Sequence, residues 1–350
     1  MSNSIQIANK SIGEGSPVFI IAELSANHNQ SIQLALDTIS AARDCGVDAV
    51  KFQTYTADTI TIDSNKEHFK IQKGTLWDGK TLYQLYKEAY TPWEWHEQLF
   101  KHASQCGLIA FSSPFDPSAA DFLQNLNVPA YKIASFEITD IPLIEYVASK
   151  KKPVIISTGI ATLEEIQEAI LACDRQNNKN IILLKCTSAY PAPFSEVNLN
   201  TIPDIQKRFN VIAGLSDHTE GISVPIGAVA LGAKVIEKHI ILDRTLGGPD
   251  SAFSLQPDQF KEMVQSVREI EQALGVVTYE LSDKILKSRE FSRSLFAVED
   301  IKSGETITCK NIRSIRPGIG LAPKFLPQLI GKKAKSDIER GTPLNLEMFE

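Results

Sequence analysis

The sequence predicts an α/β protein made of a (β/α)8 TIM barrel followed by a small, turn-rich β domain. From residue 18 onward, eight short apolar runs rich in β-branched residues alternate with segments of helical period, the pattern of parallel strands covered by helices. Eight such units within about 250 residues favour a closed barrel over an open, doubly wound sheet. Beyond residue 290 the pattern changes, because glycines and prolines divide the chain into short segments.

The predicted elements follow one another in a regular order. The strands cover residues 18–22, 49–54, 108–113, 130–135, 154–158, 181–187, 211–216 and 234–240. Helical periodicity is plainest at 32–45, 91–106, 163–173, 224–231 and 257–274, and Thr162-Leu-Glu-Glu165 has the form of a capping box. These patterns assign residues 1–280 to the barrel, 281–290 to a polar connection and 291–350 to the small domain.

A longer insertion at residues 55–90 separates the second strand from its helix. It carries several large aromatic residues, among them Trp77, Tyr83, Tyr86 and Tyr90, which are too many for a slack linker. We therefore expect the insertion to fold over one end of the barrel.

Composition and charge exclude several classes of protein. With 43% hydrophobic and 22% charged residues, the chain is typical of globular proteins. It has no run of about 18 apolar residues and no basic segment followed by an apolar core at its start, so we expect neither a membrane span nor a signal peptide, and a cytoplasmic location. The net charge of −6 argues against non-specific nucleic-acid binding.

The cysteines are scattered and form no Cys-x-x-Cys pair. We expect buried thiols in a reducing compartment, with no disulfide framework or zinc cluster. The five positions are Cys45, Cys106, Cys173, Cys186 and Cys309.

Polar residues collect at the carboxyl ends of all eight predicted strands, which is where (β/α)8 barrels carry their active sites. A lone serine there more often caps a helix, and a lone lysine or histidine is more often a paired structural residue. Polar groups on all eight strands are harder to explain without a function, since burying them is costly. In strand order they are Glu23; Lys51 and Gln53; Ser113; Lys132, Ser135 and Glu137; Ser157; Lys185 and Tyr190; Ser216 and His218; Glu237 and His239.

These residue types suggest a particular chemistry. Lys51 and Lys132, with several hydroxyls, would bind a compact polyanion such as a phosphate with a carboxylate. His218 and His239 end adjacent strands, so their imidazoles could share one divalent metal ion, with Mn²⁺ or a similar ion suiting two histidines and open positions. A closed structural zinc site is not expected without a third ligand. Glu23 and Glu137 are candidates for hydroxyl binding or acid/base work.

Several motifs at these strand ends resemble the sialic acid synthase family, whose members condense phosphoenolpyruvate with an amino sugar to give a nonulosonic acid. The resemblance spans nearly the whole chain. In the barrel it rests on Ala22-Glu-Leu-Ser-Ala-Asn-His-Asn29, Lys51-Phe-Gln53, Ser113-Pro-Phe-Asp116, Gly214-Leu-Ser-Asp-His218, Glu237-Lys-His239 and Gly248-Pro-Asp250. The tail resembles the family's SAF (antifreeze-like) domain at Ser303-Gly-Glu305, Arg316-Pro-Gly-Ile-Gly320, Gly331-Lys332 and Ile338-Glu-Arg-Gly-Thr-Pro343.

Within that family, three segments are most similar to the pseudaminic acid synthase branch. They are Ser25-Ala-Asn-His-Asn29, the insertion from Leu76-Trp-Asp-Gly-Lys-Thr-Leu-Tyr83 through Tyr90-Thr-Pro-Trp-Glu-Trp-His96, and Lys132-Ile-Ala-Ser-Phe-Glu-Ile-Thr-Asp140. Phe136 stands where other branches have a small residue, and an apolar side chain there suits a 6-deoxy sugar. The branch implies condensation of phosphoenolpyruvate, 2,4-diacetamido-2,4,6-trideoxy-L-altrose and water to pseudaminic acid and phosphate, with the product attached to flagellin or a surface polysaccharide.

The resemblance also implies a role for each matching residue. His218 and His239 would hold the metal, Mn²⁺ with Mg²⁺ or Co²⁺ as alternatives, and Glu137 would be the acid/base group. The family's SAF domain covers the barrel of the other subunit of a homodimer, and Arg316 matches the arginine that reaches the sugar. Ser188 replaces a family asparagine. Phosphoenolpyruvate would contact Lys51, Ser113, Lys132, Ser135, Ser157 and Ser216, and the sugar Glu23, Gln53, Tyr190, Asp250 and Arg316.

Three other functions stay open from the sequence. The nearest is an N-acetylneuraminic or legionaminic acid synthase with the same chemistry. A Schiff-base aldolase would use Lys132 or Lys185 as its nucleophile. A non-catalytic sugar-binding protein would not need two lysines, two histidines and two glutamates at one barrel mouth.

Overall fold

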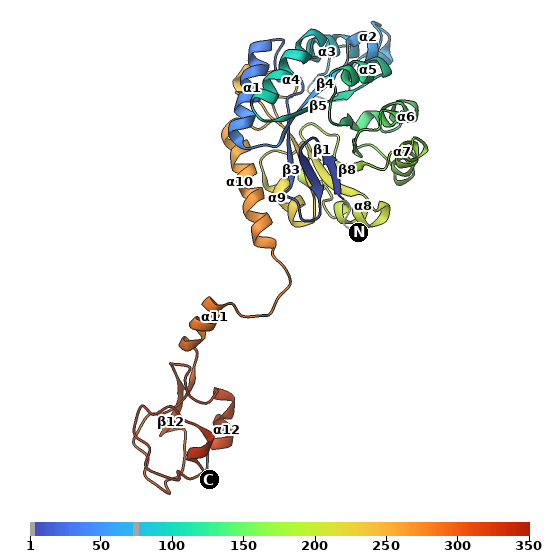
Figure 1. Cartoon of the computed structure of the whole chain (residues 1–350). Helices are drawn as coiled ribbons and strands as arrows, with labels where there is room; N and C mark the ends of the chain where they lie inside the picture. Colours follow the sequence, from blue (N-terminus) through green and yellow to red (C-terminus); the bar gives the residue numbers. More distant parts are fainter. Residues whose placement is uncertain (1–3, 73–76) are drawn as a thin grey trace. The chain divides into compact units, whose positions relative to one another are not determined.

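The computed structural model describes residues 4–72 and 77–350 and divides the chain into two compact units, Met1–Gly275 and Val276–Glu350. The predicted motif residue Leu76 lies outside the described residues. In the first unit a closed barrel is wrapped by helices (Figure 1), with the strand order β10-β3-β4-β5-β6-β7-β8-β9. Every neighbouring pair in this barrel is parallel. The predicted fold class is therefore confirmed.

The eight strands of the barrel match the predicted apolar runs to within two residues at each end. They are β3 (Phe19–Glu23), β4 (Ala49–Thr54), β5 (Ile109–Pro114), β6 (Tyr131–Ile133), β7 (Val154–Ser157), β8 (Ile181–Cys186), β9 (Ile212–Asp217) and β10 (Val235–His239).

Helices connect consecutive strands on the outside of the barrel. Several of these helices begin at a side chain that accepts from a free backbone N–H group, as Ser31, Asp116 and Asp140 do, and the Thr162–Glu165 capping box forms as predicted. The helices are α1 (Ile32–Cys45), α4 (His96–Gln105), α5 (Pro117–Asn125), α6 (Ile141–Ser149), α7 (Leu163–Arg175), α8 (Thr201–Phe209), α9 (Ser223–Ala230) and α10 (Pro257–Leu274).

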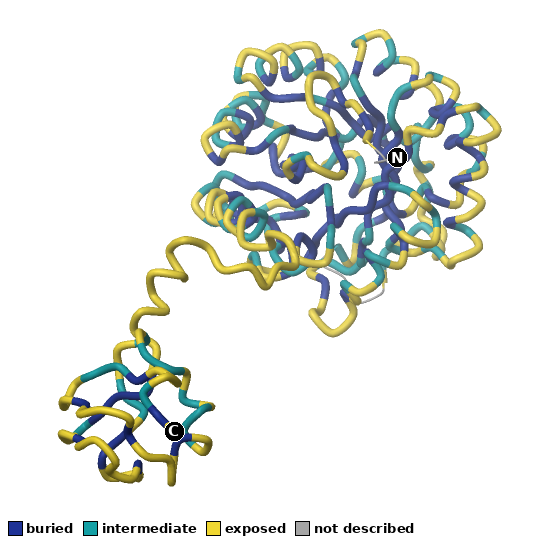
Figure 2. Tube along the Cα trace, turned by 60° about the horizontal axis from the view of Figure 1, so that its bottom comes forward, coloured by how far each residue is buried: buried dark blue, intermediate teal, exposed yellow. Residues whose placement is uncertain are grey.

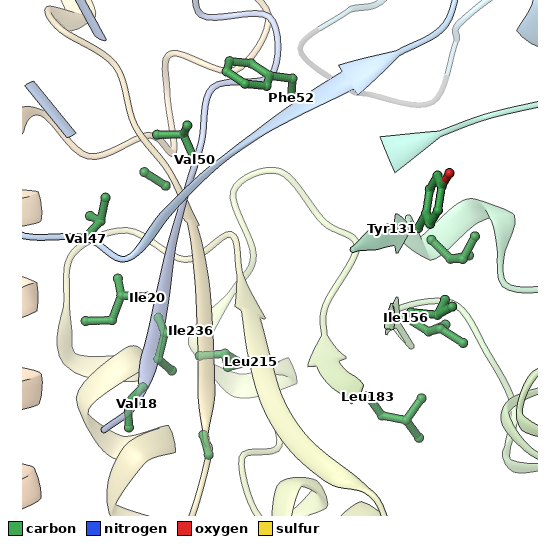
Figure 3. Packing of buried hydrophobic residues seen from close by; sticks show 14 of the residues in the cluster. Val18, Ile20, Val47, Val50, Phe52, Tyr131, Ile156, Leu183, Leu215 and Ile236 are labelled. Carbon is green, nitrogen blue, oxygen red and sulfur yellow. The ribbon is translucent and has the colours of Figure 1, made fainter. Parts of the chain in front are cut away.

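The strands are buried on both faces (Figure 2), so alternate residues enter two different apolar layers. The outer layer packs between strands and helices and includes Ile20, Val50 and Ile236 (Figure 3). The inner layer fills the amino-terminal half of the barrel with residues such as Phe19, Phe111 and Val235. Because the amino-terminal half is apolar and packed, a site inside the barrel can lie only at the carboxyl ends of the strands.

A short hairpin, which the sequence did not predict, packs against the inner layer. It consists of β1 (Ser4–Ile7) and β2 (Lys10–Gly13), paired antiparallel. Its residues Ile5, Ile7 and Ile12 are buried in the same cluster as the inner barrel residues. Four-residue strands at a chain end give too short a pattern to be distinguished from a leading loop.

The insertion after β4 contains α2 (Ala57–Ile60), a 3₁₀ turn at Glu67–Phe69 and α3 (Leu82–Ala89). The rings of Tyr55 and Tyr86 pack edge to face at 5.7 Å between centroids. The indole Nε1 of Trp77 donates to the carbonyl of Pro249 in the loop after β10, at 3.2 Å. The insertion thus folds over the carboxyl end of the barrel, as expected.

The second unit has its own small core. Strands β11 (Ser294–Ala297) and β12 (Ile312–Ile315) pair antiparallel, and α12 (Leu326–Leu329) packs beside them. Buried apolar residues such as Leu295, Ile307 and Phe349 fill the space between the turns. Residues 281–290, predicted as a polar connection, include a short helix, α11 (Asp283–Ser288), which Ser282 caps.

Two of the five cysteines are not buried. Cys309 is exposed and Cys106 is half-buried, so the prediction of buried thiols is wrong for these two, because both lie in polar segments near the surface. Within residues 4–72 and 77–350, none of the helices is both long and apolar enough to cross a membrane.

Candidate active site

A cavity of about 340 Å³ opens at the carboxyl end of the barrel, between the strand ends and the insertion. Twelve of the fourteen predicted site residues line it, and the other two, Ser113 and Arg316, do not. The twelve are Glu23, Lys51, Gln53, Lys132, Ser135, Glu137, Ser157, Tyr190, Ser216, His218, His239 and Asp250.

Two lysines lie at the floor of the cavity. The ammonium of Lys51 is 2.5 Å from Glu23 Oε2, and that of Lys132 donates to Ser157 Oγ at 2.7 Å. Burial alone would lower the pKa of Lys51, but Glu23 and Glu237 outweigh burial and raise it. Burial prevails at Lys132, whose pKa is lowered although Glu237 opposes the shift. The floor therefore carries two closely spaced cationic groups with carboxylates beside them.

Glu237 connects the two lysines; the sequence placed it among the strand-end polar residues but assigned it no role. Its Oε1 is 3.8 Å from the ammonium nitrogens of both Lys51 and Lys132 and accepts from Ser216 Oγ at 3.0 Å. Burial would raise the pKa of this carboxyl, but the two lysines outweigh burial and lower it. The available signal was strand alternation, because Glu237 shares a face of β10 with His239.

Ser113 was predicted to contact the substrate, but it does not line the cavity. It is fully buried on β5, where its hydroxyl accepts from Lys51 Nζ at 3.4 Å. The adjacent loop residue Phe115 lines the cavity instead. In this structure Ser113 contacts Lys51, and its predicted contact with phosphoenolpyruvate stays a prediction.

Glu137 lies on a 3₁₀ turn, Ser135–Glu137, just beyond β6. Its Oε2 is buried and accepts no hydrogen bond from the residues that the structure describes. Burial raises the pKa of this carboxyl to about 7, with Lys132 partly opposing the shift. A carboxyl with such a pKa is poised to exchange a proton near neutral pH.

The imidazoles of His218 and His239 face each other, with ring centroids 5.3 Å apart. Nδ1 of His218 lies 3.1 Å from the carbonyl oxygen of Thr187, so an N–H there would leave Nε2 as a free ligand atom. Nδ1 of His239 is buried without a hydrogen bond in the described part of the chain, 3.8 Å from Asp250 Oδ2. Two imidazoles with unsatisfied nitrogens fit a divalent metal ion.

No three metal-ligating side chains come together within residues 4–72 and 77–350. A metal ion held by His218 and His239 would therefore take its remaining ligands from oxygen atoms of water or substrate. That is the coordination of an open site, at which a substrate oxygen can bind the ion directly.

Cys186 also lines the cavity, which its prediction as a buried thiol did not foresee. Its Sγ is 3.8 Å from His218 Nδ1. Burial raises a thiol pKa, but His218 and neighbouring hydrogen bonds outweigh burial and lower the pKa of Cys186 to about 7. A single cysteine on a barrel strand gave no sequence signal of this environment.

The side of the cavity nearer the opening combines polar and aromatic groups. Gln53 Nε2 donates to Ser25 Oγ at 2.9 Å and to Glu23 Oε1 at 3.2 Å. The ring of Tyr190 packs against His218 and Trp77 at 4.5 Å and 5.8 Å between centroids. An apolar wall completes this side, made by Ile60, Leu85, Tyr86, Phe115 and Phe136.

The neighbourhood of β7 is tightly packed. The hydroxyl of Ser135 accepts from the backbone N–H of Gly159 at 2.7 Å. A Cβ at Gly159 would lie 2.2 Å from Ser188 Oγ and 2.5 Å from Ser135 Oγ, so only glycine lets the loop approach. Ser188, the residue that replaces a family asparagine, thus packs on this loop.

Two residues with predicted chemistry lie elsewhere. Lys185, a candidate nucleophile, is not part of the cavity wall and donates to the carbonyl of Cys186 at 2.5 Å. Arg316 belongs to the second unit, where it is exposed directly after β12. Its predicted contact with the sugar stays a prediction.

Comparisons with known proteins agree with this geometry. The NeuB family model matches residues 38–279 and the SAF domain model matches residues 292–350. A pseudaminic acid synthase of Campylobacter jejuni subsp. jejuni serotype O:23/36 is 51% identical, over 95% of this chain and 96% of its own. A pseudaminic acid synthase of Helicobacter pylori is 48% identical, over 95% and 98%.

Among solved structures, the N-acetylneuraminic acid (sialic acid) synthetase from Leptospira borgpetersenii serovar Hardjo-bovis, in complex with citrate, is similar with a TM-score of 0.74. It is 33% identical, and the match covers 83% of this chain and 96% of that chain. The resemblance predicted from the strand-end motifs is confirmed: this chain belongs to the NeuB family and carries a SAF domain at residues 292–350.

Proposed function

We propose that this chain is a pseudaminic acid synthase, which condenses phosphoenolpyruvate with 2,4-diacetamido-2,4,6-trideoxy-L-altrose and water to give pseudaminic acid and phosphate. The observation that carries the proposal is the convergence of two buried lysines, two imidazoles and Glu137 in one cavity of a NeuB-family barrel. The cavity residues alone would suit several nonulosonic acid synthases. The two pseudaminic acid synthases compared above favour this sugar.

Phosphoenolpyruvate would bind at the floor. Its phosphate and carboxylate need cationic partners and hydrogen-bond donors, which Lys51, Lys132 and the hydroxyls of Ser135, Ser157 and Ser216 supply. Glu23 and Glu237 hold the two ammonium groups in place until the anion arrives. Fixed cations also stabilise the phosphate as it leaves, without reorganisation during the reaction.

His218 and His239 would hold the metal ion, for which we propose Mn²⁺. A divalent ion supplies Lewis-acid polarisation of the aldehyde oxygen and helps to orient the sugar. The protein's own contribution is to hold the open-chain aldehyde near the phosphoenolpyruvate at the floor. Gln53, Glu23, Tyr190 and Asp250 would bind the sugar's hydroxyl and amide groups.

The bond changes follow from this arrangement. C3 of phosphoenolpyruvate attacks the aldehyde carbon, the aldehyde C=O π bond breaks to leave an alkoxide, and a cationic centre forms at C2 beside the carboxylate. Glu137, in its ionised form, takes a proton from the water that adds at C2 and gives it to the alkoxide, which becomes a hydroxyl. The resulting tetrahedral intermediate breaks the bond from C2 to the phosphate oxygen, and its C2 hydroxyl becomes a carbonyl whose proton leaves with the phosphate. Lys51 and Lys132 neutralise the charge of the released phosphate.

An isotope experiment tests this bond cleavage. Phosphoenolpyruvate labelled with oxygen-18 in the bridging position should give phosphate that carries the label, because the C–O bond breaks and the P–O bond does not. The phosphate and the sugar acid are analysed by mass spectrometry. Label found in the sugar acid would contradict the mechanism.

The apolar wall should select a 6-deoxy sugar. The aldehyde carbon reacts at the floor, so C6, at the other end of the open chain, must face the opening, where Phe136 is 58% exposed. A methyl group would bury apolar area there, whereas a hydroxyl would lose hydrogen bonds to water. We expect kcat/KM to be about 10-fold or more higher for the 6-deoxy sugar than for its 6-hydroxy analogue, since one such group is worth about 1–3 kcal/mol.

Phe136→Ser provides the matched comparison for this preference. Because the side chain is largely exposed, the variant should fold and keep its affinity for phosphoenolpyruvate while the ratio of the two kcat/KM values falls. A wild-type ratio near one, or an unchanged ratio in the variant, would contradict the proposed role of the wall.

We also propose that the protein is a homodimer in which the SAF domain of one subunit covers the barrel of the other and Arg316 reaches the sugar. Arg316→Ala should then raise the KM of the sugar far more than that of phosphoenolpyruvate. Equal effects on both would contradict this assignment.

Mixing two inactive variants tests whether the arginine acts between subunits. After subunit exchange at low sugar concentration, Glu137→Gln and Arg316→Ala proteins would form mixed dimers with one complete site, and activity should return. Absence of recovery, when exchange is verified by light scattering and a tag, would show that each barrel uses its own arginine.

The Schiff-base aldolase can be distinguished from the proposed synthase by experiment. A Schiff-base aldolase would need Lys132 to attack a carbonyl, and its lowered pKa suits that role. However, Lys132 Nζ already donates to Ser157 Oγ and to the carbonyl of Ile133, at 2.7 and 3.0 Å. Borohydride trapping of a lysine adduct would favour the aldolase, whereas loss of turnover with EDTA favours the proposed synthase.

A further inference from the structure

Asp217 and Lys238 form a buried ion pair on the outer face of the barrel wall, the face opposite the cavity. Their side chains are 2% and 0% exposed. The residues on either side of them, Ser216 and His218 on β9 and Glu237 and His239 on β10, line the cavity. Since side chains alternate along a strand, Asp217 and Lys238 point toward the helices. They are also direct partners in the β9–β10 ladder.

The ion pair is part of a larger set of hydrogen bonds. Lys238 Nζ donates to the carboxylate of Asp217 and, at 2.6 Å, to the backbone carbonyl of Thr219. The same carboxylate accepts from the backbone N–H and from the hydroxyl of Thr219, both at 3.1 Å. All of these groups are buried. We call the three residues Asp217, Thr219 and Lys238 the clamp.

The position of the clamp in the sequence gives it a specific consequence. Asp217 and Thr219 are the two neighbours of His218, and Lys238 directly precedes His239. The clamp therefore connects both neighbours of His218 to Lys238, the residue next to His239. Ladder hydrogen bonds alone hold β9 and β10 in register only as far as Asp217 and Lys238, so His218 lies just beyond the last paired residue.

We propose that the clamp is a positioning device that sets the separation of the His218 and His239 imidazoles and thereby the affinity for the divalent metal ion. A buried ion pair costs desolvation and often adds no net stability, so a role in geometry accounts for its place better than a role in stability. Metal ligands must be held to within a fraction of an ångström. This inference rests on the metal site proposed above.

The test compares Mn²⁺ affinity with thermal stability in purified full-length protein. In the double variant Asp217→Leu/Lys238→Met, apolar side chains replace both charges, so the fold should persist. We expect the Kd for Mn²⁺, measured by calorimetry, to rise about 10-fold to 100-fold, the range found when groups supporting metal ligands are removed. The KM for phosphoenolpyruvate should change much less than the Kd, because the lysines at the floor are untouched.

Two further variants make the result decisive. Thr219→Val removes one hydroxyl donor without changing the shape of the side chain and should also weaken Mn²⁺ binding. Ile236→Val is the control, since it loosens the same outer layer two residues before Lys238 and should lower Tm without changing the Kd.

The outcomes separate the clamp from the metal site itself. An unchanged Kd in the double variant would overturn the proposal, and if that variant does not fold, an unchanged Kd in Thr219→Val would overturn it. Wild-type protein that binds no Mn²⁺ would contradict the metal site and the clamp together. Wild-type binding that is lost in His218→Gln but kept in the clamp variants would contradict the clamp alone.

Discussion

Replacing His218 or His239 by glutamine is expected to abolish metal-dependent turnover while the barrel stays folded. A metal ion that polarises the aldehyde is worth several kcal/mol in the transition state, so we expect kcat to fall by about 10³-fold or more. The fold should tolerate the change, because Nδ1 of His239 makes no hydrogen bond within the described chain. The measurements are kcat with and without EDTA, Mn²⁺ binding by calorimetry and the thermal unfolding curve.

A matched control is available on the outside of the barrel. His102 lies on α4 and its ring is hydrogen-bonded to Ser40 at 2.9 Å, outside the cavity. His102→Gln should keep both Mn²⁺ binding and turnover. EDTA-sensitive turnover within about tenfold of the wild type in either cavity variant would contradict the assignment of the two imidazoles.

Replacing Glu137 by glutamine should lower kcat by about 10²-fold to 10⁴-fold, the usual contribution of a general base. In the wild type, kcat should rise with pH through about 7, because burial raises the pKa of this carboxyl to about 7 and the base must be ionised to accept a proton. The variant should lose this rise. The comparison is a pH–rate profile of each protein, with the exposed Glu164→Gln as a control. The same rise of kcat through about pH 7 in the Glu137 variant would contradict the role of Glu137 as the general base.

The same pKa shift predicts an effect on stability. The pKa is about 7 in the folded state against an ordinary value of 4.5, so the folded state binds the proton more tightly than the unfolded state. The carboxyl's ionisation therefore reduces the free energy of unfolding as pH rises from about 4.5 to 7, by up to about 3 kcal/mol. Urea unfolding at pH 5 and pH 8 should show Glu137→Gln gaining stability over the wild type at the higher pH.

Most of the fold could be predicted because its patterns are long and repeated. Eight apolar runs fix eight strands, and a parallel barrel brings their carboxyl ends together whatever the details of packing. The hairpin β1–β2 could not be predicted in the same way, because two strands of four residues carry almost no periodicity. The burial of their isoleucines can be explained only once the structure shows that they pack against the inner layer of the barrel.

The site was predictable at strand ends and less so elsewhere. Lys51, His218 and His239 were found because strand order alone places them together. Glu237 was recognised as a strand-end polar residue but given no role, since its role depends on two lysines from other strands. The position of Ser113 outside the cavity lining was not predictable, because whether a strand-end serine faces a cavity or a neighbouring lysine depends on side-chain packing. Cys186 acquires its lowered pKa from His218, which is distant in the sequence.

The sugar acid that this chain makes is identified by comparing how fast the protein condenses each candidate sugar with phosphoenolpyruvate. The protein is incubated with phosphoenolpyruvate, Mn²⁺ and, separately, 2,4-diacetamido-2,4,6-trideoxy-L-altrose, its 6-hydroxy analogue, the sugar precursor of legionaminic acid and N-acetylmannosamine. We expect the L-altrose sugar to be consumed with the highest kcat/KM and to yield a product with the mass of pseudaminic acid together with phosphate. Faster turnover of one of the other sugars, or no condensation product from the L-altrose sugar, would contradict the proposed function.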